Sequence, residues 1–314
     1  MKKIIICVLS LSIVLVGAFS VAALSNNSDL LTTEKQTDIS TQPGSSELNK
    51  PIDVKKLNTQ KQNIFNNILN CTDYYDSASG TFETTFVDNS PVTISYDVNI
   101  PEQISSQIVK GANIDFDILC KDGLLIEANN KSRNYIENRL IPQYDQTKRI
   151  KQTAPINEEV SLQKYYNYDK TDVSKERVRK NAAGEMEFYY KTDLTNASMA
   201  ATSINPQNLV FGFMSEFDSW KVANVEEYLG RQVIVITGKT ADSEYASKLR
   251  VDVFEMKFDI KTGILLDFKG CLSDGTLTHY LTTSELEVDG KDTTLYKEIG
   301  ERVTSIINSY ENAR

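Results

Sequence analysis

Residues 253–277 read VFEMKFDIKTGILLDFKGCLSDGTL, and this stretch shows the fold more clearly than any other part of the chain. Apolar and polar residues alternate on both sides of Lys261-Thr262-Gly263, and Ser273-Asp274-Gly275 follows the second run. A period of two is typical of a strand with one apolar face, and a short polar segment ending in glycine is typical of a tight turn. The stretch therefore predicts antiparallel strands joined by tight turns.

The same alternation appears upstream and predicts further strands. The alternating apolar side chains are Phe82 and Phe86, then Val92, Ile94, Tyr96, Val98 and Ile100, then Ile114, Phe116, Ile118 and Cys120. Helical spacing instead marks residues 53–70 and 292–310, and Asn205-Pro206 is a favourable helix start. About eight to ten strands with a few amphipathic helices predict an α+β fold. We expect a curled antiparallel sheet, or half-open β-barrel, with helices covering its concave face.

The N-terminus has the pattern of an export signal. Lys2 and Lys3 precede a mostly apolar run, and small residues end it at Ser20-Val21-Ala22-Ala23. Residues 1–23 are therefore predicted to be either a signal peptide or an uncleaved N-terminal membrane anchor. Residues 24–53 are rich in small polar residues and predict a flexible linker, and residues 54–314 are predicted to be one domain. Either outcome predicts an extracytoplasmic protein, secreted or anchored to the outer face of the cytoplasmic membrane.

Composition excludes several classes of protein. The 34 basic and 43 acidic residues give a net charge of −9, which disfavours binding to nucleic acid. The single histidine, His279, excludes a histidine-rich metal site, and no nucleotide-binding or metalloprotease motif is present, so no cofactor or metal is predicted. The three cysteines beyond the export signal leave alternatives open. Cys71, Cys120 and Cys271 are either buried thiols, or one bridge joins Cys71 to Cys120 or Cys120 to Cys271, or one bridge is intermolecular.

One pattern resembles a serine-enzyme active site. Ser161-x-x-Lys164, Ser203-x-Asn205 and Lys261-Thr262-Gly263 occur in the order of the penicillin-recognising enzymes. However, Ser161 leads into a polar tyrosine-rich segment rather than an apolar helix, and Lys261-Thr262-Gly263 is explained as a tight turn. The prediction is therefore that the protein is not an enzyme.

Residues 253–277, together with the preceding Gly230-Arg-Gln-Val-Ile-Val-Ile-Thr-Gly238, resemble the periplasmic lipoprotein carriers of LolA/LolB type and the sigma-factor regulatory proteins of RseB type. The shared form is a strand, an Asp-x-x-Thr-Gly turn, a strand, an Asp-Gly turn and a strand. This resemblance implies a half-open barrel over a hydrophobic cavity that holds acyl chains or a lipidated protein, without catalysis. The residues predicted to line the cavity are Phe82, Phe86, Ile94, Tyr96, Phe116, Ile118, Phe254, Met256, Phe258 and Phe268.

Two functions follow from this resemblance. The first is an exported, non-enzymatic lipid- or lipoprotein-binding protein. The alternative is an envelope-signalling or protein-interaction module of RseB type, with a filled cavity, that binds a membrane-anchored anti-sigma factor or a wall enzyme. A hollow cavity favours the first function, and a packed core with an exposed apolar patch favours the second.

Overall fold

The computed structural model describes residues 52–85, 90–139, 151–153, 155–156, 165–166, 172–173, 177–184, 186–240, 244–290 and 295–313. Residues Ile52–Arg314 form one compact unit. Within the described ranges, no helix is both long enough and apolar enough to cross a membrane. The predicted boundaries of the signal segment, the linker and the domain stay a prediction.

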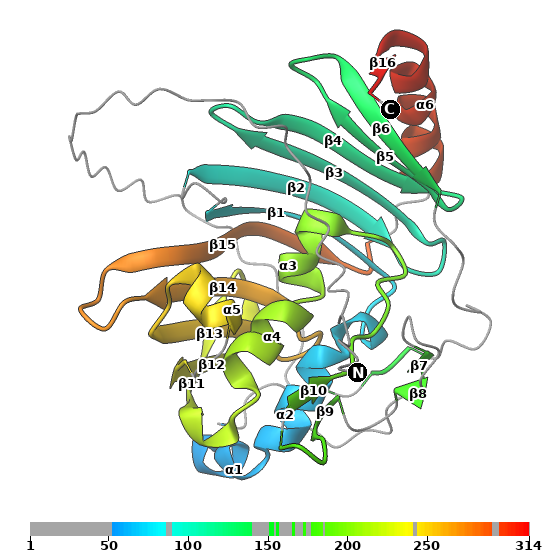
Figure 1. Ribbon diagram of the computed structural model, residues 1–314. Coiled ribbons are helices and arrows are strands. Elements are labelled where there is room, and N and C mark those ends of the chain that lie inside the picture. Colours follow the sequence, from blue (N-terminus) through cyan, green and yellow to red (C-terminus); the bar gives the residue numbers. More distant parts are fainter. Residues whose placement is uncertain are drawn as a thin grey trace, which may run out of the picture. The chain divides into compact units, whose positions relative to one another are not determined.

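Twelve strands form one open sheet in the order β11-β12-β13-β14-β15-β1-β2-β3-β4-β5-β6-β16 (Figure 1). All neighbours are antiparallel except β16, which pairs in parallel with β6. The bounds are β1 Ser77–Thr85, β2 Pro91–Asn99, β3 Ile104–Gly111, β4 Asp115–Lys121, β5 Leu124–Asn129, β6 Asn134–Arg139, β11 Trp220–Tyr228, β12 Arg231–Lys239, β13 Val253–Asp259, β14 Leu265–Cys271, β15 Leu277–Val288 and β16 Glu311–Asn312. The predicted fold class, a curled sheet with helices, is confirmed.

Short elements complete the chain. Two small ribbons lie outside the large sheet, one made of β7 Tyr165–Tyr166 and β8 Asp172–Val173, the other of β9 Val178–Lys180 and β10 Met186–Phe188. The helices are α1 Val54–Thr59, α2 Lys61–Leu69, α3 Ala201–Ile204, α4 Gln207–Met214, α5 Glu244–Leu249 and α6 Leu295–Ser309, with 3-10 turns η1 Cys71–Asp73, η3 Ser198–Ala200 and η4 Phe217–Ser219. The helix expected over 53–70 is divided at Gln60, which ends α1 and precedes α2.

The turn between β13 and β14 is held by its own polar side chains. Asp259 accepts hydrogen bonds from Thr262 Oγ1 at 2.5 Å and from Arg231 Nη2 at 2.9 Å. Gly263 has a φ of +74°, and a Cβ there would lie 3.1 Å from Cys71 Cβ. Glycine is therefore required both by the backbone conformation and by the close approach of η1. This arrangement confirms that Lys261-Thr262-Gly263 is a tight turn.

The sheet carries a separate core on each face. Ile118 on β4 belongs to the large core beneath α2, α3 and α4, whereas its neighbour Leu119 packs with Ile299 and Ile306 of α6. Successive strand residues point to opposite faces, so α6 covers the other face of the sheet. In Figure 1, α6 lies beside β5 and β6, away from α2, α3 and α4. The helix at 292–310 therefore does not cover the concave face as expected, because its apolar stripe matches the outward residues of β3–β6.

Candidate functional site

The strand register places the predicted wall residues on one face of the sheet. Phe82 pairs with Ile94, Met256 pairs with Phe268, and Ile118 pairs with Gln107, which pairs in turn with Tyr96. We call this surface the helix-covered face. The buried members are Phe82, Ile94, Tyr96, Ile118, Phe254, Met256, Phe258 and Phe268, while Phe116 is half-buried and Phe86 lies outside the described residues. Their role as the wall of a ligand cavity stays a prediction.

Helix α4 occupies the space against these residues. The Phe213 ring centroid lies 5.3 Å from that of Phe254 and 5.4 Å from that of Phe268. Seven of the eight residues of α4 are buried, and Trp220 Nε1 donates to Met214 O at 2.8 Å where the helix ends. Two pockets, of about 530 and 450 Å³, open elsewhere, and none of the predicted wall residues lines them. Helix α4 therefore covers the centre of the helix-covered face.

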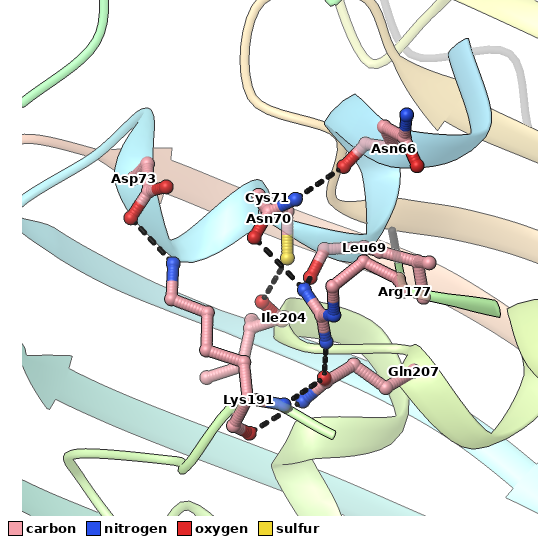
Figure 2. Close-up of polar contacts among 9 residues, drawn as sticks. All are labelled: Asn66, Leu69, Asn70, Cys71, Asp73, Arg177, Lys191, Ile204 and Gln207. Carbon is pink, nitrogen blue, oxygen red and sulfur yellow. Dashed lines mark hydrogen bonds and ion pairs between the residues drawn. The ribbon is translucent and has the colours of Figure 1, made fainter. Parts of the chain in front are cut away.

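A buried polar cluster, which we call the polar anchor, holds the start of α4 against η1 (Figure 2). It consists of Asp73, Arg177, Lys191 and Gln207 with the groups they bind. Arg177 is only 1% exposed, and its guanidinium donates to Leu69 O at 3.2 Å, Asn70 Oδ1 at 2.8 Å, Tyr189 O at 2.6 Å and Gln207 Oε1. A buried guanidinium is tolerated when acceptors surround it in this way.

A buried ion pair forms the second half of the polar anchor. Lys191 Nζ lies 2.5 Å from Asp73 Oδ1, and both side chains are 2% exposed. Burial lowers the pKa of Lys191 to about 8, although the attraction of Asp73 opposes this shift. Nearby, Cys71 Sγ donates to Ile204 O at 3.0 Å, and burial raises the pKa of this thiol to about 12, so it is a poor nucleophile. The cluster is built to join segments and not to react.

A second buried polar region, the α3 interface, lies between α3 and the sheet. It consists of α3 with Tyr96, Gln107 and Asn205. Gln107 Oε1 accepts from Ala200 N at 2.9 Å, whereas the buried Tyr96 hydroxyl has no hydrogen-bond partner. Burial raises the pKa of Tyr96 well above its ordinary value, so its hydroxyl stays protonated. Gln107 Nε2 and Asn205 Oδ1 are buried without a hydrogen-bond partner.

Sequence reasoning missed the polar anchor. Residues 175–180 read KERVRK, and such a short basic run by itself is interpreted as a solvated helix end, yet Arg177 is buried and Val178–Lys180 form the strand β9. That interpretation is wrong because a single-sequence pattern does not show which carbonyl groups the tertiary fold brings to a guanidinium. The one sequence signal was Pro206 before an apolar run, which correctly predicted α4 but not what holds it.

The structure also bears on the serine-enzyme pattern, the cysteines and a possible metal site. Ser161 and Lys164 lie outside the described residues, while Ser203 is buried and donates to Leu265 O at 2.8 Å. Cys71, Cys120 and Cys271 are all free thiols, so neither proposed internal bridge forms. In the described part of the chain, no group of three or more metal-ligating side chains gathers at one place.

No family model matches the sequence, and no curated protein matches it. Among solved structures, the chain is similar to MucB in the MucA/MucB complex of Pseudomonas aeruginosa (11% identity, TM-score 0.39), over 76% of this chain and 60% of that one. It is also similar to LprF from Mycobacterium bovis (10% identity, TM-score 0.36; 75% of this chain and 95% of that one) and to the lipoprotein LppX from Mycobacterium tuberculosis (10% identity, TM-score 0.27; 77% and 100%).

These likenesses concern the fold alone. The matched region spans less than two thirds of the MucB chain.

Proposed function

We propose that this chain is an exported, non-enzymatic binding protein whose ligand is an acyl chain or a lipidated protein. The extracytoplasmic location rests on the N-terminal export pattern of residues 1–23. The observation that carries the binding function is the register of the sheet, which gathers all nine described wall residues on one face beneath a short apolar helix. Such a face binds by burying methylene groups, at about 0.8 kcal/mol each.

Binding on this face requires α4 to give way. The rings of Phe213, Phe254 and Phe268 occupy the centre of the face, so an acyl chain would replace the contacts that Phe213 makes. An apolar ligand and the apolar side of α4 thus compete for the same surface. A ligand that binds only the open state has an apparent affinity that falls as the closed fraction of the protein rises. Weakening the contacts of α4 should therefore strengthen ligand binding.

The full chain, secreted by a bacterial host and purified without detergent, is first examined by native mass spectrometry. We expect a bound mass that is released as lipid on denaturation. Phe213→Leu should then bind the apolar fluorophore pyrene severalfold more tightly than the wild type. Ile299→Val, on α6 beneath the other face, is the matched core control and should leave binding unchanged. A wild-type protein that carries no lipid and takes up no pyrene would contradict the proposal.

A second candidate function, a protein-interaction module, is favoured by the packed centre of the helix-covered face together with an exposed aromatic patch. Phe188 and Tyr190 are 40% and 37% exposed, and their rings lie 5.2 and 4.8 Å from that of buried Phe211 on α4. Exposed aromatic side chains are typical of interaction surfaces. A membrane-anchored signalling protein or a wall enzyme is the partner proposed for this alternative. It would be supported if Phe188→Ser abolished capture of an envelope protein while the purified chain bound no lipid.

A further inference from the structure

The α3 interface combines deep burial with polar atoms that lack partners. Gln107 is 0% exposed and Asn205 is 9% exposed, and Gln107 Nε2 and Asn205 Oδ1 have no hydrogen-bond partner. Buried polar atoms without partners are rare in native proteins, and each one calls for an explanation. With the Tyr96 hydroxyl, three such atoms belong to the α3 interface, on an otherwise apolar face.

These groups share one location. Gln107 and Tyr96 are cross-strand partners on β3 and β2, so their side chains stand next to each other on the helix-covered face. Ala200, directly before α3, donates to Gln107. Ser203 within α3 lies near the Tyr96 hydroxyl but donates to Leu265 O, so the Tyr96 hydroxyl has no hydrogen-bond partner. Asn205 directly follows α3, and its backbone N–H bonds to Ala201 O. One turn of helix therefore lies against Gln107 and Tyr96, and Asn205 directly follows it.

The sheet makes room for the Tyr96 hydroxyl. A Cβ at Gly80 would lie 3.0 Å from Tyr96 Oη and 2.4 Å from the carbonyl oxygen of Glu285. The absence of a side chain at Gly80 thus lets the tyrosine ring extend over β1. A polar hydroxyl is accommodated in the middle of a surface whose neighbours include Phe82, at a ring distance of 6.0 Å.

The chemistry of this set is polar but uncharged. Gln107 offers an N–H donor, Asn205 offers a carbonyl acceptor, and the Tyr96 hydroxyl can do both. Two charges of opposite sign act on Tyr96, that of Asp97 and, more weakly, that of Arg231, which is paired with Asp259 at 2.9 Å. The chain as a whole carries a net charge of −9, which disfavours anionic ligands. The complementary group therefore has both a carbonyl and a hydroxyl or N–H, and no net charge.

We infer that the α3 interface receives the polar end of the ligand, an uncharged hydroxyl-bearing ester or an amide at the head of an acyl chain. The acyl chain would extend from there along Phe254, Met256 and Phe258. This inference rests on the proposed function and adds to it the class of headgroup and its position. A shift of α3 away from the sheet would expose Tyr96 and Gln107 to the headgroup.

The test compares a polar and an apolar ligand on the full-length chain. Pyrene fluorescence measures binding to the helix-covered face, and competition by 1-monopalmitoylglycerol measures headgroup recognition. We expect Tyr96→Phe and Gln107→Leu to bind pyrene within about twofold of the wild type, because neither removes apolar surface. Both substitutions should weaken the binding of 1-monopalmitoylglycerol by about five- to tenfold, as expected for one lost buried hydrogen bond. Tyr280→Phe, which removes an exposed hydroxyl bonded to Glu83, is the matched control.

Different outcomes contradict the headgroup position and the proposed function. If both variants bind pyrene normally and 1-monopalmitoylglycerol competes as in the wild type, the headgroup position is wrong while the proposed function stands. If palmitate competes better than 1-monopalmitoylglycerol, the uncharged class is wrong. If the wild-type chain binds neither pyrene nor lipid, the proposed function itself fails.

Discussion

Gln207 in the polar anchor and Gln107 in the α3 interface are both buried, yet their amides are used very differently. Gln207 Oε1 accepts from Arg177 and from Lys191 N at 2.7 Å, and its Nε2 donates to Lys191 O at 2.9 Å. Gln107 Oε1 accepts one bond, from Ala200 N, and its Nε2 donates none. The Gln207 amide joins three segments of the chain, whereas the Gln107 amide has N–H donors that bind no acceptor.

This difference indicates where the cover of the sheet is fixed and where it can open. Breaking a buried network leaves several polar groups unpaired at once, whereas removing an unpartnered group loses little. The start of α4 is therefore firmly attached to η1 and Arg177. The contact of α3 with β2 and β3 is the weaker one, so we expect an opening motion to begin there.

The largest expected effect comes from breaking the ion pair of the polar anchor. Lys191→Met leaves the Asp73 carboxylate buried without its partner, which should lower the free energy of unfolding by about 3–5 kcal/mol. Urea unfolding followed by far-UV circular dichroism measures this change. The double variant Asp73→Asn/Lys191→Met should recover most of the loss. Equal stability of the single and double variants would show that the pair is not what holds η1.

The two glutamines provide the most direct comparison, with a smaller expected effect. Gln207→Leu should lower the free energy of unfolding by about 2–3 kcal/mol, because it removes the hydrogen bonds of Gln207 to Arg177 and to the backbone N–H and C=O of Lys191. Gln107→Leu should change it by less than about 1 kcal/mol, because it removes an unpartnered donor together with one hydrogen bond. The same urea titration measures both variants. Equal losses would remove the distinction between the two regions.

Much of the fold was predictable because alternation depends only on neighbouring residues. The period of two correctly predicted the strands that carry Ile94, Phe116 and Met256, and the turn at Lys261-Thr262-Gly263 follows from local chemistry. The alternation also predicted a common face, since register preserves the side on which each apolar residue lies. What it could not predict was that α4 fills this face.

The unpredicted features depend on contacts between distant segments. Arg177 binds Leu69 O and Asn70, more than one hundred positions earlier in the chain, and no local pattern in a single sequence encodes such a pairing. The position of α6 was missed for a related reason. Its apolar stripe shows that one side of the helix is buried, but not which face of the sheet buries it.

Acidification is a third test, with a smaller expected effect. It protonates His279, which belongs to neither the polar anchor nor the α3 interface. His279 on β15 lies beside Phe268, at a ring distance of 6.0 Å, and burial lowers its pKa to about 4. The unfolded chain binds a proton on the His279 imidazole more readily than the folded chain does. The stability that neutral His279 provides is therefore complete above pH 6.5 and is lost as the pH falls toward 4. We expect the free energy of unfolding to fall by about 1–2 kcal/mol between pH 7.5 and pH 5 from this residue.

His279→Gln isolates this contribution, since it is the single histidine of the chain. Asp267 and Glu127, whose pKa values are raised by burial, remain in the variant and set the background pH dependence. The difference between the unfolding free energies at pH 7.5 and pH 5 should therefore be smaller in His279→Gln than in the wild type. Since the protonated imidazole would lie under Phe268, which α4 covers through Phe213, acid should also increase amide hydrogen exchange in α4. A pH dependence that is identical in both proteins would show that His279 is accessible to water in the folded chain.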